Sequence, residues 1–259
     1  MYRIGCNWSE ALGALLIEGI VDVDFVKYGV YPDYDEKFAR IRPMKPILLH
    51  GLGCFDHAGM RSPEAVDFTA ANVRIAACGS PHYGLHLAIK NADMDPGMTD
   101  ADVRARLLSG IRTFKENLRA PLLLENTPDS PQDRAAFDHH PYAEPEKLAD
   151  ILETADAGLL LDLTHAKITA RFRGWDVRDF LRALPLQRVR EIHINGSGKD
   201  ESGFPADTHQ AMEAEDRSLL DWTLARTNPN VVTLEYSGFA GEPESAVRKN
   251  LLIQLTQLH

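Results

Sequence analysis

The segment AGLLLDLT, residues 157–164, runs through three leucines to an acidic residue, Asp162. Such a nearly continuous apolar run is typical of a strand in a parallel sheet, because helices cover both faces of that sheet. Similar runs recur along the chain, and each is followed by a segment with helical periodicity. These other runs span residues 2–8, 23–29, 45–51, 83–89, 120–127, 190–196 and 231–237.

The segments between these runs have the pattern of helices that pack on a sheet. In residues 102–118, apolar residues recur on one face and Arg and Lys occupy the other, and Thr99 is a candidate cap. Pro63 and Pro145 each stand at the start of an expected helix, where proline is tolerated. A last helix is expected near residues 243–258.

Eight alternating strand and helix units in 259 residues predict an α/β protein with a single (β/α)8 TIM barrel that spans residues 1–259. No Gly-, Ser- or Pro-rich linker divides the chain, so we expect one domain. An open doubly wound sheet is the main alternative. Its usual Gly-rich phosphate turn is missing after the first run, which favours the barrel.

The balance of charges limits the partners of the protein. The chain has 38 acidic and 28 basic residues, and its formal net charge of -10 disfavours nucleic acid and anionic membranes. We expect a cytoplasmic protein, because neither a signal peptide nor a membrane-spanning apolar run is evident. The three cysteines, Cys6, Cys54 and Cys78, are odd in number and widely spaced, so we expect reduced thiols.

Ionisable residues gather where the expected strands end. The carboxyl ends of the strands form the active-site face of a (β/α)8 barrel, and six consecutive runs carry His, Asp or Glu at or just beyond that end. Buried carboxylates and imidazoles are costly without a partner, and few Lys or Arg residues lie among them. Two or three divalent metal ions would supply the missing positive charge. The candidate ligands are His50, His86, Glu125, Asp162, His165, His193, Asp207, His209 and Glu235.

Some of these residues, and one lysine, are also candidates for catalysis. Glu125 and Glu235 are candidate catalytic carboxylates as well as ligands, and Lys27 is a candidate cation or proton donor at the end of the second run. The Gly-rich loop 196–207 is expected to fold over the site as a lid.

Two asparagines and the remaining histidines have other expected places. Asn126 is a candidate to orient Glu125, and Asn195 is a candidate to orient His193. The histidines outside the candidate ligand set are expected to be exposed to solvent in loops or at the terminus. They are His57, His82, His139, His140 and His259.

The order of the candidate ligands resembles the xylose-isomerase-like barrel superfamily, which includes sugar isomerases, epimerases and the endonuclease IV group. The pattern H…H…E…DxxH…H…DxH…E is similar to the trinuclear zinc set of endonuclease IV. The flanking stretches are more similar to those of the multinuclear non-haem iron-dependent oxidative enzymes. These stretches are ILLHGLG, GLHLA, RAPLLLENT, AGLLLDLTHA, LPLQRVREIHING and PADTHQAM.

The resemblance to the iron-dependent enzymes implies a cluster of two or three iron ions that activates dioxygen. It also implies a peptide substrate, presented by a partner protein, whose cysteine or other side chain is oxidised. The chain departs from that pattern at His165, where Asn is common, and in a shorter helical region after the first run. Zinc and manganese stay open as alternatives to iron, because ligands that offer only nitrogen and oxygen suit all three metals.

Three reactions are compatible with these patterns. The first is iron-dependent oxidation of a cysteine-containing or similar peptide. The second is isomerisation or epimerisation of a small-molecule sugar or sugar phosphate, which uses one or two metals with acid and base residues. The third is metal-dependent phosphodiester hydrolysis, against which the acidic net charge and the lack of an Arg-and-aromatic cluster argue. A non-catalytic metal-binding barrel is the least favoured, given so many candidate ligands.

Overall fold

The structure, a computed structural model, describes residues 1–51, 57–136 and 140–259. Its main sheet has eight parallel strands in the order β3-β2-β1-β10-β7-β6-β5-β4. Each predicted run overlaps one of them, so the strand predictions are confirmed. The strands are β1 (Arg3–Asn7), β2 (Phe25–Tyr28), β3 (Ile47–Leu49), β4 (Tyr83–His86), β5 (Leu122–Glu125), β6 (Gly158–Asp162), β7 (Val189–Ile194) and β10 (Val231–Leu234).

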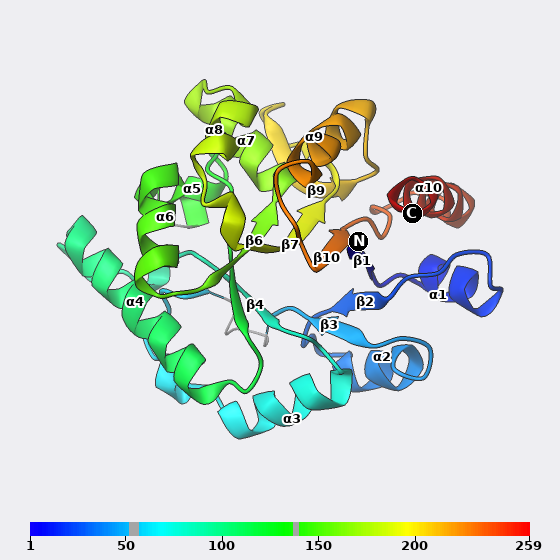
Figure 1. Ribbon diagram of the computed structural model, residues 1–259, viewed down its shortest axis with the longest axis horizontal. Coiled ribbons are helices and arrows are strands. Elements are labelled where there is room, and N and C mark those ends of the chain that lie inside the picture. Colours follow the sequence, from blue (N-terminus) through cyan, green and yellow to red (C-terminus); the bar gives the residue numbers. More distant parts are fainter. Residues whose placement is uncertain (52–56, 137–139) are drawn as a thin grey trace.

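The sheet curves into a nearly closed barrel with the helices around its outside (Figure 1). In the described part of the chain, the end strands β3 and β4 meet at one parallel bridge, between His50 and Gly84. Because the sheet curves back on itself at this seam, the predicted (β/α)8 barrel is confirmed and the open doubly wound sheet is excluded.

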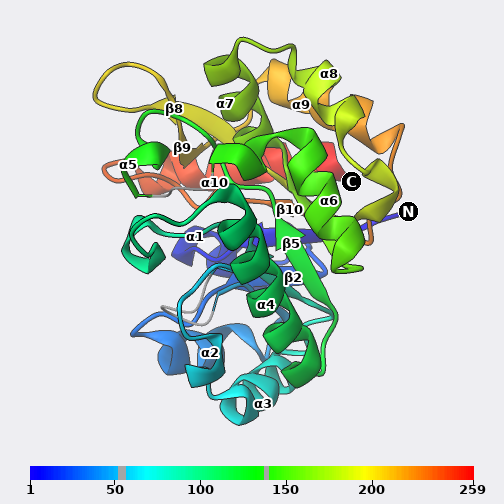
Figure 2. The ribbon, with the colours of Figure 1, turned by 90° about the vertical axis from the view of Figure 1, so that its left-hand side faces the viewer.

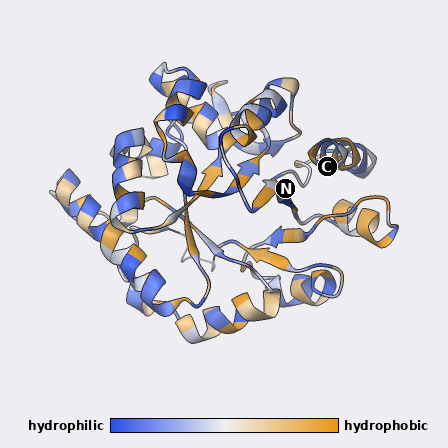
Figure 3. Cartoon of the chain, viewed as in Figure 1, coloured by the Kyte–Doolittle hydropathy of each residue, from blue (hydrophilic) through white to orange (hydrophobic). Residues whose placement is uncertain are grey.

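The helices follow the strands as the periodicity predicts. The longer ones are α1 (Glu10–Ile17), α2 (Tyr34–Ile41), α3 (Phe68–Cys78), α4 (Asp100–Asn117), α6 (Pro145–Thr154), α7 (Leu163–Arg173), α8 (Val177–Ala183), α9 (Ala214–Leu224) and α10 (Glu244–Leu258). The short ones are α5 (Asp133–Ala136), η1 (Pro63–Ala65), η2 (Asn91–Asp93), η3 (His140–Ala143) and η4 (Leu186–Arg188). Figure 3 shows hydrophilic and hydrophobic residues mixed along the helices, as expected where one face packs on the sheet and the other meets water.

Two predicted helix starts are confirmed and one is wrong. Thr99 caps α4 in a capping box, and α6 begins at Pro145. Pro63 opens only the short turn η1, because the backbone at Val66 is extended and ends it. The helix α3 starts later, after Asp67, whose side chain accepts a hydrogen bond from the backbone of the first turn.

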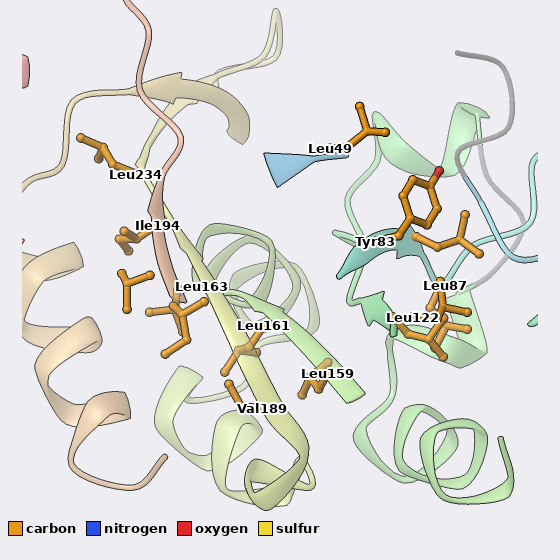
Figure 4. Close-up of a cluster of buried hydrophobic side chains, with 14 of the residues drawn as sticks. Leu49, Tyr83, Leu87, Leu122, Leu159, Leu161, Leu163, Val189, Ile194 and Leu234 are labelled. Atoms are coloured by element: carbon orange, nitrogen blue, oxygen red, sulfur yellow. The ribbon is translucent and has the colours of Figure 1, made fainter. Parts of the chain in front are cut away.

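Apolar side chains between the strands and the helices form the main core. Leu159 and Leu161 of β6, Ile194 of β7 and Leu234 of β10 lie in it and are at most 1% exposed (Figure 4). Burial of each such side chain contributes roughly 1.5–3 kcal/mol to stability. The predicted apolar face of α4 is buried in the same core and consists of Val103, Leu107, Ile111, Phe114 and Leu118.

The alternate residues of the strands face the barrel axis instead. Phe25, Leu48 and Val231 form a small separate apolar cluster there. Glu191 and His193 are two positions apart on β7, so they face the same side of the sheet, and both are buried. The barrel interior is therefore partly apolar and partly ionisable.

Other expectations concern the membrane, the cysteines and the loop histidines. None of the helices in the described residues is long and apolar enough to cross a membrane. Cys6 and Cys78 are buried free thiols, and His259 is exposed as predicted. Cys54, His139 and the side chain of His140 lie outside the described part of the chain.

The close packing of α4 gives a test of the fold. A Cβ atom on Gly110 would lie 2.0 Å from the backbone oxygen of Ala58. We expect Gly110→Ala to lower the free energy of unfolding by about 1–3 kcal/mol, because the helix would have to move away from that backbone. Thermal or denaturant unfolding measures the change. Ser109→Ala, at the exposed neighbouring position, is the control and should change stability by less than about 0.5 kcal/mol. Equal stability of both variants would contradict this packing.

Candidate metal centre

The register of the strands brings predicted ligands together at their carboxyl ends. His86 of β4 lies beside Glu125 of β5, and Asp162 of β6 lies beside His193 of β7. Glu235 directly follows β10, the next strand after β7 in the sheet. Parallel pairing thus aligns side chains that are far apart in sequence.

Glu125 is the centre of this arrangement and is 2% exposed. Its Oε2 lies 2.7 Å from His50 Nε2 and 3.2 Å from His86 Nε2. Its Oε1 lies 3.3 Å from His193 Nδ1 and 3.8 Å from His165 Nδ1. Oε2 therefore faces His50 and His86 while Oε1 faces His193, and this arrangement suits a carboxylate shared between two metal ions.

The D-x-x-H motif leaves one carboxylate oxygen directed at the cluster. Asp162 caps α7, because its Oδ1 accepts a hydrogen bond of 2.6 Å from the backbone N–H of His165. Its Oδ2 is buried and has no hydrogen-bond partner among the described residues. This atom lies 4.0 Å from His193 Nδ1. A buried oxygen without a partner, next to imidazole nitrogens, is an atom that a metal ion would satisfy.

The predicted lid is an antiparallel hairpin of β8 (Gly196–Lys199) and β9 (Pro205–Gln210). Figure 2 shows it at the left of the view, on the side of the barrel opposite to the N-terminus. That side is the carboxyl-end face of the strands, where the candidate ligands lie. The loop therefore brings its own ligands to the site.

Asp207 and His209 are the ligands that this hairpin carries. Asp207 Oδ2 lies 3.1 Å from His165 Nε2 and 3.3 Å from His209 Nε2. His209 has a φ of 51°, which is uncommon for a residue other than glycine and tends to occur at functional sites. Asn195 donates a hydrogen bond of 2.8 Å to Asp207 Oδ1, so it orients this carboxylate and not His193 as we had expected.

Asn126 also differs from its predicted role. It exchanges two hydrogen bonds with the backbone of Asp162, each 2.9 Å long, and therefore does not orient the carboxylate of Glu125. Its own carbonyl oxygen accepts a hydrogen bond of 2.8 Å from His165 Nδ1. The Nε2 atom of His165 is thus left to face Asp207, as the ligand atom of a metal-binding histidine does when its other nitrogen is occupied.

All nine predicted ligands belong to one connected cluster. Two groups have ligand atoms that lie within 4.8 Å of one another, and they share Glu125 and His193. The groups are His50, Glu125 and His193, and Glu125, Asp162, His193 and Glu235. The other four ligands join them through ion pairs, and these are His86, His165, Asp207 and His209.

The cluster opens into a cavity of about 400 Å³. It is lined by candidate ligands and by Lys27. Its lining also includes aromatic and small polar residues, which are Asn7, Trp8, Tyr28, Tyr31 and Ser237. A cavity lined by both polar and aromatic side chains is typical of a site that binds an organic substrate.

Lys27 supplies positive charge to this cluster. Its Nζ contacts Glu235 Oε1 and lies 3.5 Å from His193 Nδ1. Burial acts to lower the pKa of Lys27, but Glu235 and Glu125 outweigh it and raise the pKa, so the side chain is an ammonium at neutral pH. One ammonium offsets only part of the charge of the carboxylates in the cluster, which are Glu125, Asp162, Asp207 and Glu235.

The negative charge that Lys27 does not offset changes the pKa values of the candidate ligands. Burial, with the nearby carboxylates of Glu235 and Asp207, raises the pKa of Asp162 to about 8. Burial alone would lower the pKa of the imidazoles, yet Asp162 and Asp207 raise that of His165, and Glu235 raises that of His193. Without metal ions, protons therefore supply the missing positive charge.

This proton content predicts how metal binding depends on pH. Because His165 and His193 have raised pKa values, they must lose protons before they can act as ligands, so zinc binding should release protons at neutral pH. The affinity for zinc should rise between about pH 6 and pH 8. Calorimetric titration in buffers of different ionisation enthalpy measures the released protons. An affinity that does not change with pH would contradict the prediction.

Two histidines were wrongly predicted to be exposed. His57 is 2% exposed and His82 is 6% exposed. His57 forms a parallel bridge with His86, and its Nε2 lies 3.2 Å from Asp93. His82 enters the barrel, where its Nε2 contacts Glu191. Both partners are distant in sequence, so no local pattern indicated them.

Glu191 is a buried ionisable residue next to the ligand cluster that was not predicted from the sequence. It stands two residues before the candidate ligand His193 in the run REIHI, where polar and apolar residues alternate. That alternation was the available signal, because it places Glu191 and His193 on the same face of β7.

Comparison with known proteins adds the family. A family model described as RiPP precursor modification enzyme MbnB/TglH/ChrH matches residues 24–247. The chain belongs to this family. A UPF0276 protein of Acaryochloris marina is 31% identical over 205 residues, which cover 76% of this chain and 72% of that protein. A UPF0276 protein of Shewanella oneidensis is 28% identical over 242 residues, which cover 87% of this chain and 79% of that protein.

Solved structures show the fold class. A xylose isomerase domain containing protein from Salmonella typhimurium has a TM-score of 0.65 and 12% identity, covering 99% of this chain and 97% of that one. The IOLI protein, solved with a zinc atom, has a TM-score of 0.63 and 13% identity, covering 98% and 96%. A D-allulose 3-epimerase from Methylomonas sp. has a TM-score of 0.60 and 14% identity, covering 100% and 97%.

These findings confirm the resemblance that the sequence motifs indicated. The barrel is xylose-isomerase-like, and the family is that of MbnB/TglH/ChrH. Together with the ligand cluster, they support a metal-dependent TIM-barrel enzyme.

Proposed function

We propose that this chain is an iron-dependent oxidative enzyme that uses dioxygen to modify a cysteine or similar side chain of a peptide. The position of Glu125 carries the proposal, because its Oε2 faces the Nε2 atoms of His50 and His86 while its Oε1 faces Nδ1 of His193. The description of the family as precursor modification enzymes supports a peptide as the substrate. A partner protein that presents the peptide belongs to the same proposal.

The residues present fit a cluster of two or three divalent ions. The unpartnered Oδ2 of Asp162 and the excess of carboxylates over Lys27 both call for cations at this place. The ligand set offers nitrogen and oxygen without thiolate, which suits iron, manganese or zinc, and the resemblance of the sequence motifs to the iron-dependent oxidative enzymes favours iron. By proximity, three groups would hold the ions. They are His50, His86 and Glu125; Glu125, Asp162, His193 and Glu235; and His165, Asp207 and His209.

The chain's own side chains would then bind and orient the substrate. Iron, when bound, supplies the binding of dioxygen and one-electron redox chemistry. The ammonium of Lys27 holds Glu235 in place and puts a fixed positive charge at the cavity wall, where it can stabilise a thiolate. Trp8 and Tyr31 line the cavity and would contact the residues that flank the reacting side chain.

The metal content tests this proposal. Protein purified without chelators should contain two or three iron ions per chain and show a visible absorption band when oxidised. Mass spectrometry of a cysteine-containing peptide, incubated with the reduced protein with and without dioxygen, should show an oxygen-dependent change of mass. If a short cysteine-containing peptide is encoded beside this gene, it is the first substrate to try. A single manganese ion with turnover of a ketose, or zinc with hydrolysis of a phosphodiester, would instead support the isomerase or the hydrolase alternative.

Removal of the shared carboxylate should dismantle the cluster. We expect Glu125→Ala and His50→Ala to lose most of the bound metal and all activity, because each removes a ligand atom from the interacting groups. Circular dichroism should show that the barrel stays folded. The control is Asp216→Asn, which changes a buried carboxylate that caps α9. Iron retained in full by Glu125→Ala, or lost from Asp216→Asn, would contradict the assignment.

A further inference from the structure

One buried carboxylate lies next to the ligand cluster without belonging to it. Glu191 faces the barrel axis and is 2% exposed. The groups of potential metal ligands among the described residues do not include it. Phe25, Leu48 and Val231 show that other axial positions in this barrel are filled by apolar side chains. A buried charge is less favourable for the free energy of folding than a well-packed apolar residue of similar size, so the burial of Glu191 needs an explanation.

Polar groups hold both oxygens of this carboxylate. Glu191 Oε2 contacts His82 Nε2, and Glu191 Oε1 accepts a hydrogen bond from the hydroxyl of Thr233. Thr233 lies beside His193 in the register of β10 with β7. The side chain of Glu191 is therefore fixed between the residue just before β4 and a residue of β10.

The same carboxylate faces the inner nitrogen of a candidate ligand. His193 Nε2 lies 3.3 Å from Glu191 Oε1, an ion-pair distance, and this buried nitrogen makes no hydrogen bond among the described residues, so Glu191 is the acceptor within reach of a proton on it. The opposite nitrogen, Nδ1, lies 3.3 Å from Glu125 Oε1 and 3.2 Å from Glu235 Oε2. The two nitrogens of this fully buried ring thus face two different sets of carboxylates.

We propose that Glu191 is a positioning residue that keeps a proton on His193 Nε2 and so reserves Nδ1 for a metal ion. A neutral imidazole has one donor and one acceptor nitrogen, and a carboxylate can only accept from it. A carboxylate behind a metal-binding histidine fixes the tautomer and the plane of the ring in this way. His82 and Thr233 hold Glu191 in place. The inference rests on the metal site of the proposed function, and it adds a residue that acts through His193.

Two substitutions separate this role from a contribution to stability alone. Glu191→Leu removes the hydrogen-bond acceptor and puts an apolar side chain of similar size in its place, whereas Glu191→Gln keeps an acceptor oxygen. We expect Glu191→Leu to weaken zinc binding roughly 10–100-fold in competition with a chelator, and Glu191→Gln to recover part of the loss. The control is Asp129→Asn, a buried carboxylate bound by Arg134 and Arg173 outside the ligand cluster. It should lower the unfolding temperature and leave zinc affinity unchanged.

Nitrogen NMR of the histidine rings gives a second measurement, which does not depend on activity. In the zinc-loaded wild type, His193 should carry its proton on Nε2 and bind zinc through Nδ1. A proton on Nδ1, or unchanged affinity in a folded Glu191→Leu variant, would overturn the inference. An equal loss of zinc affinity in Asp129→Asn would overturn it too, because it would show that lower stability alone weakens zinc binding.

The measurement also distinguishes failure of this inference from failure of the proposed function. If the wild type takes up no metal, the proposed function fails, and the tautomer of His193, measured in the metal-free protein at a pH high enough to remove the second proton of the ring, decides the role of Glu191. If the wild type binds metal but His193 is protonated on Nδ1, only the role of Glu191 fails. If Glu191→Leu does not fold, the Gln variant and the wild-type tautomer give the decision.

Discussion

The burial of one carboxylate, Glu125, sets the requirements that the rest of the site meets. A charge with so little contact with water is tolerable only where positive charge or hydrogen-bond donors surround it. The parallel register of β5 with β4 places His86 beside it, and the curvature of the barrel brings His193 to its other oxygen. The surroundings of this carboxylate therefore depend on the positions of strands that are far apart in the sequence.

The alternation of side chains along each strand separates structure from chemistry. On β6, Leu159 and Leu161 pack in the main core, while Asp162 at the end of the strand faces the ligands. On β7, Ile194 packs in that core, while Glu191 and His193 lie on the axis. The same strands therefore position both the apolar side chains of the core and the ionisable side chains of the site.

The sequence predicted those parts of the molecule that local patterns determine. Strands covered on both faces must be apolar, so all eight were found, and the motif D-x-x-H placed its ligands because Asp162 is also a helix cap. Contacts between distant residues were not predictable in this way. The pairing of His82 with Glu191 joins positions 109 residues apart, and the partner of Asn126 depends on which strand lies next to β5. Tertiary packing alone decides which nitrogen of a histidine ring, or which group of an asparagine side chain, makes a contact.

The cluster has a closed inner end and an open outer end. Asp162 and His193 are completely buried, whereas the side chain of His209, on the hairpin, is 41% exposed. A catalytic metal site needs a coordination position that substrate can reach. On the proposed function, we infer that the substrate enters through the cavity that His209 of the hairpin lines together with Trp8 and Tyr31. The left-handed backbone of His209 fits this division, because strain of that kind is kept where surrounding structure must present a side chain to a ligand.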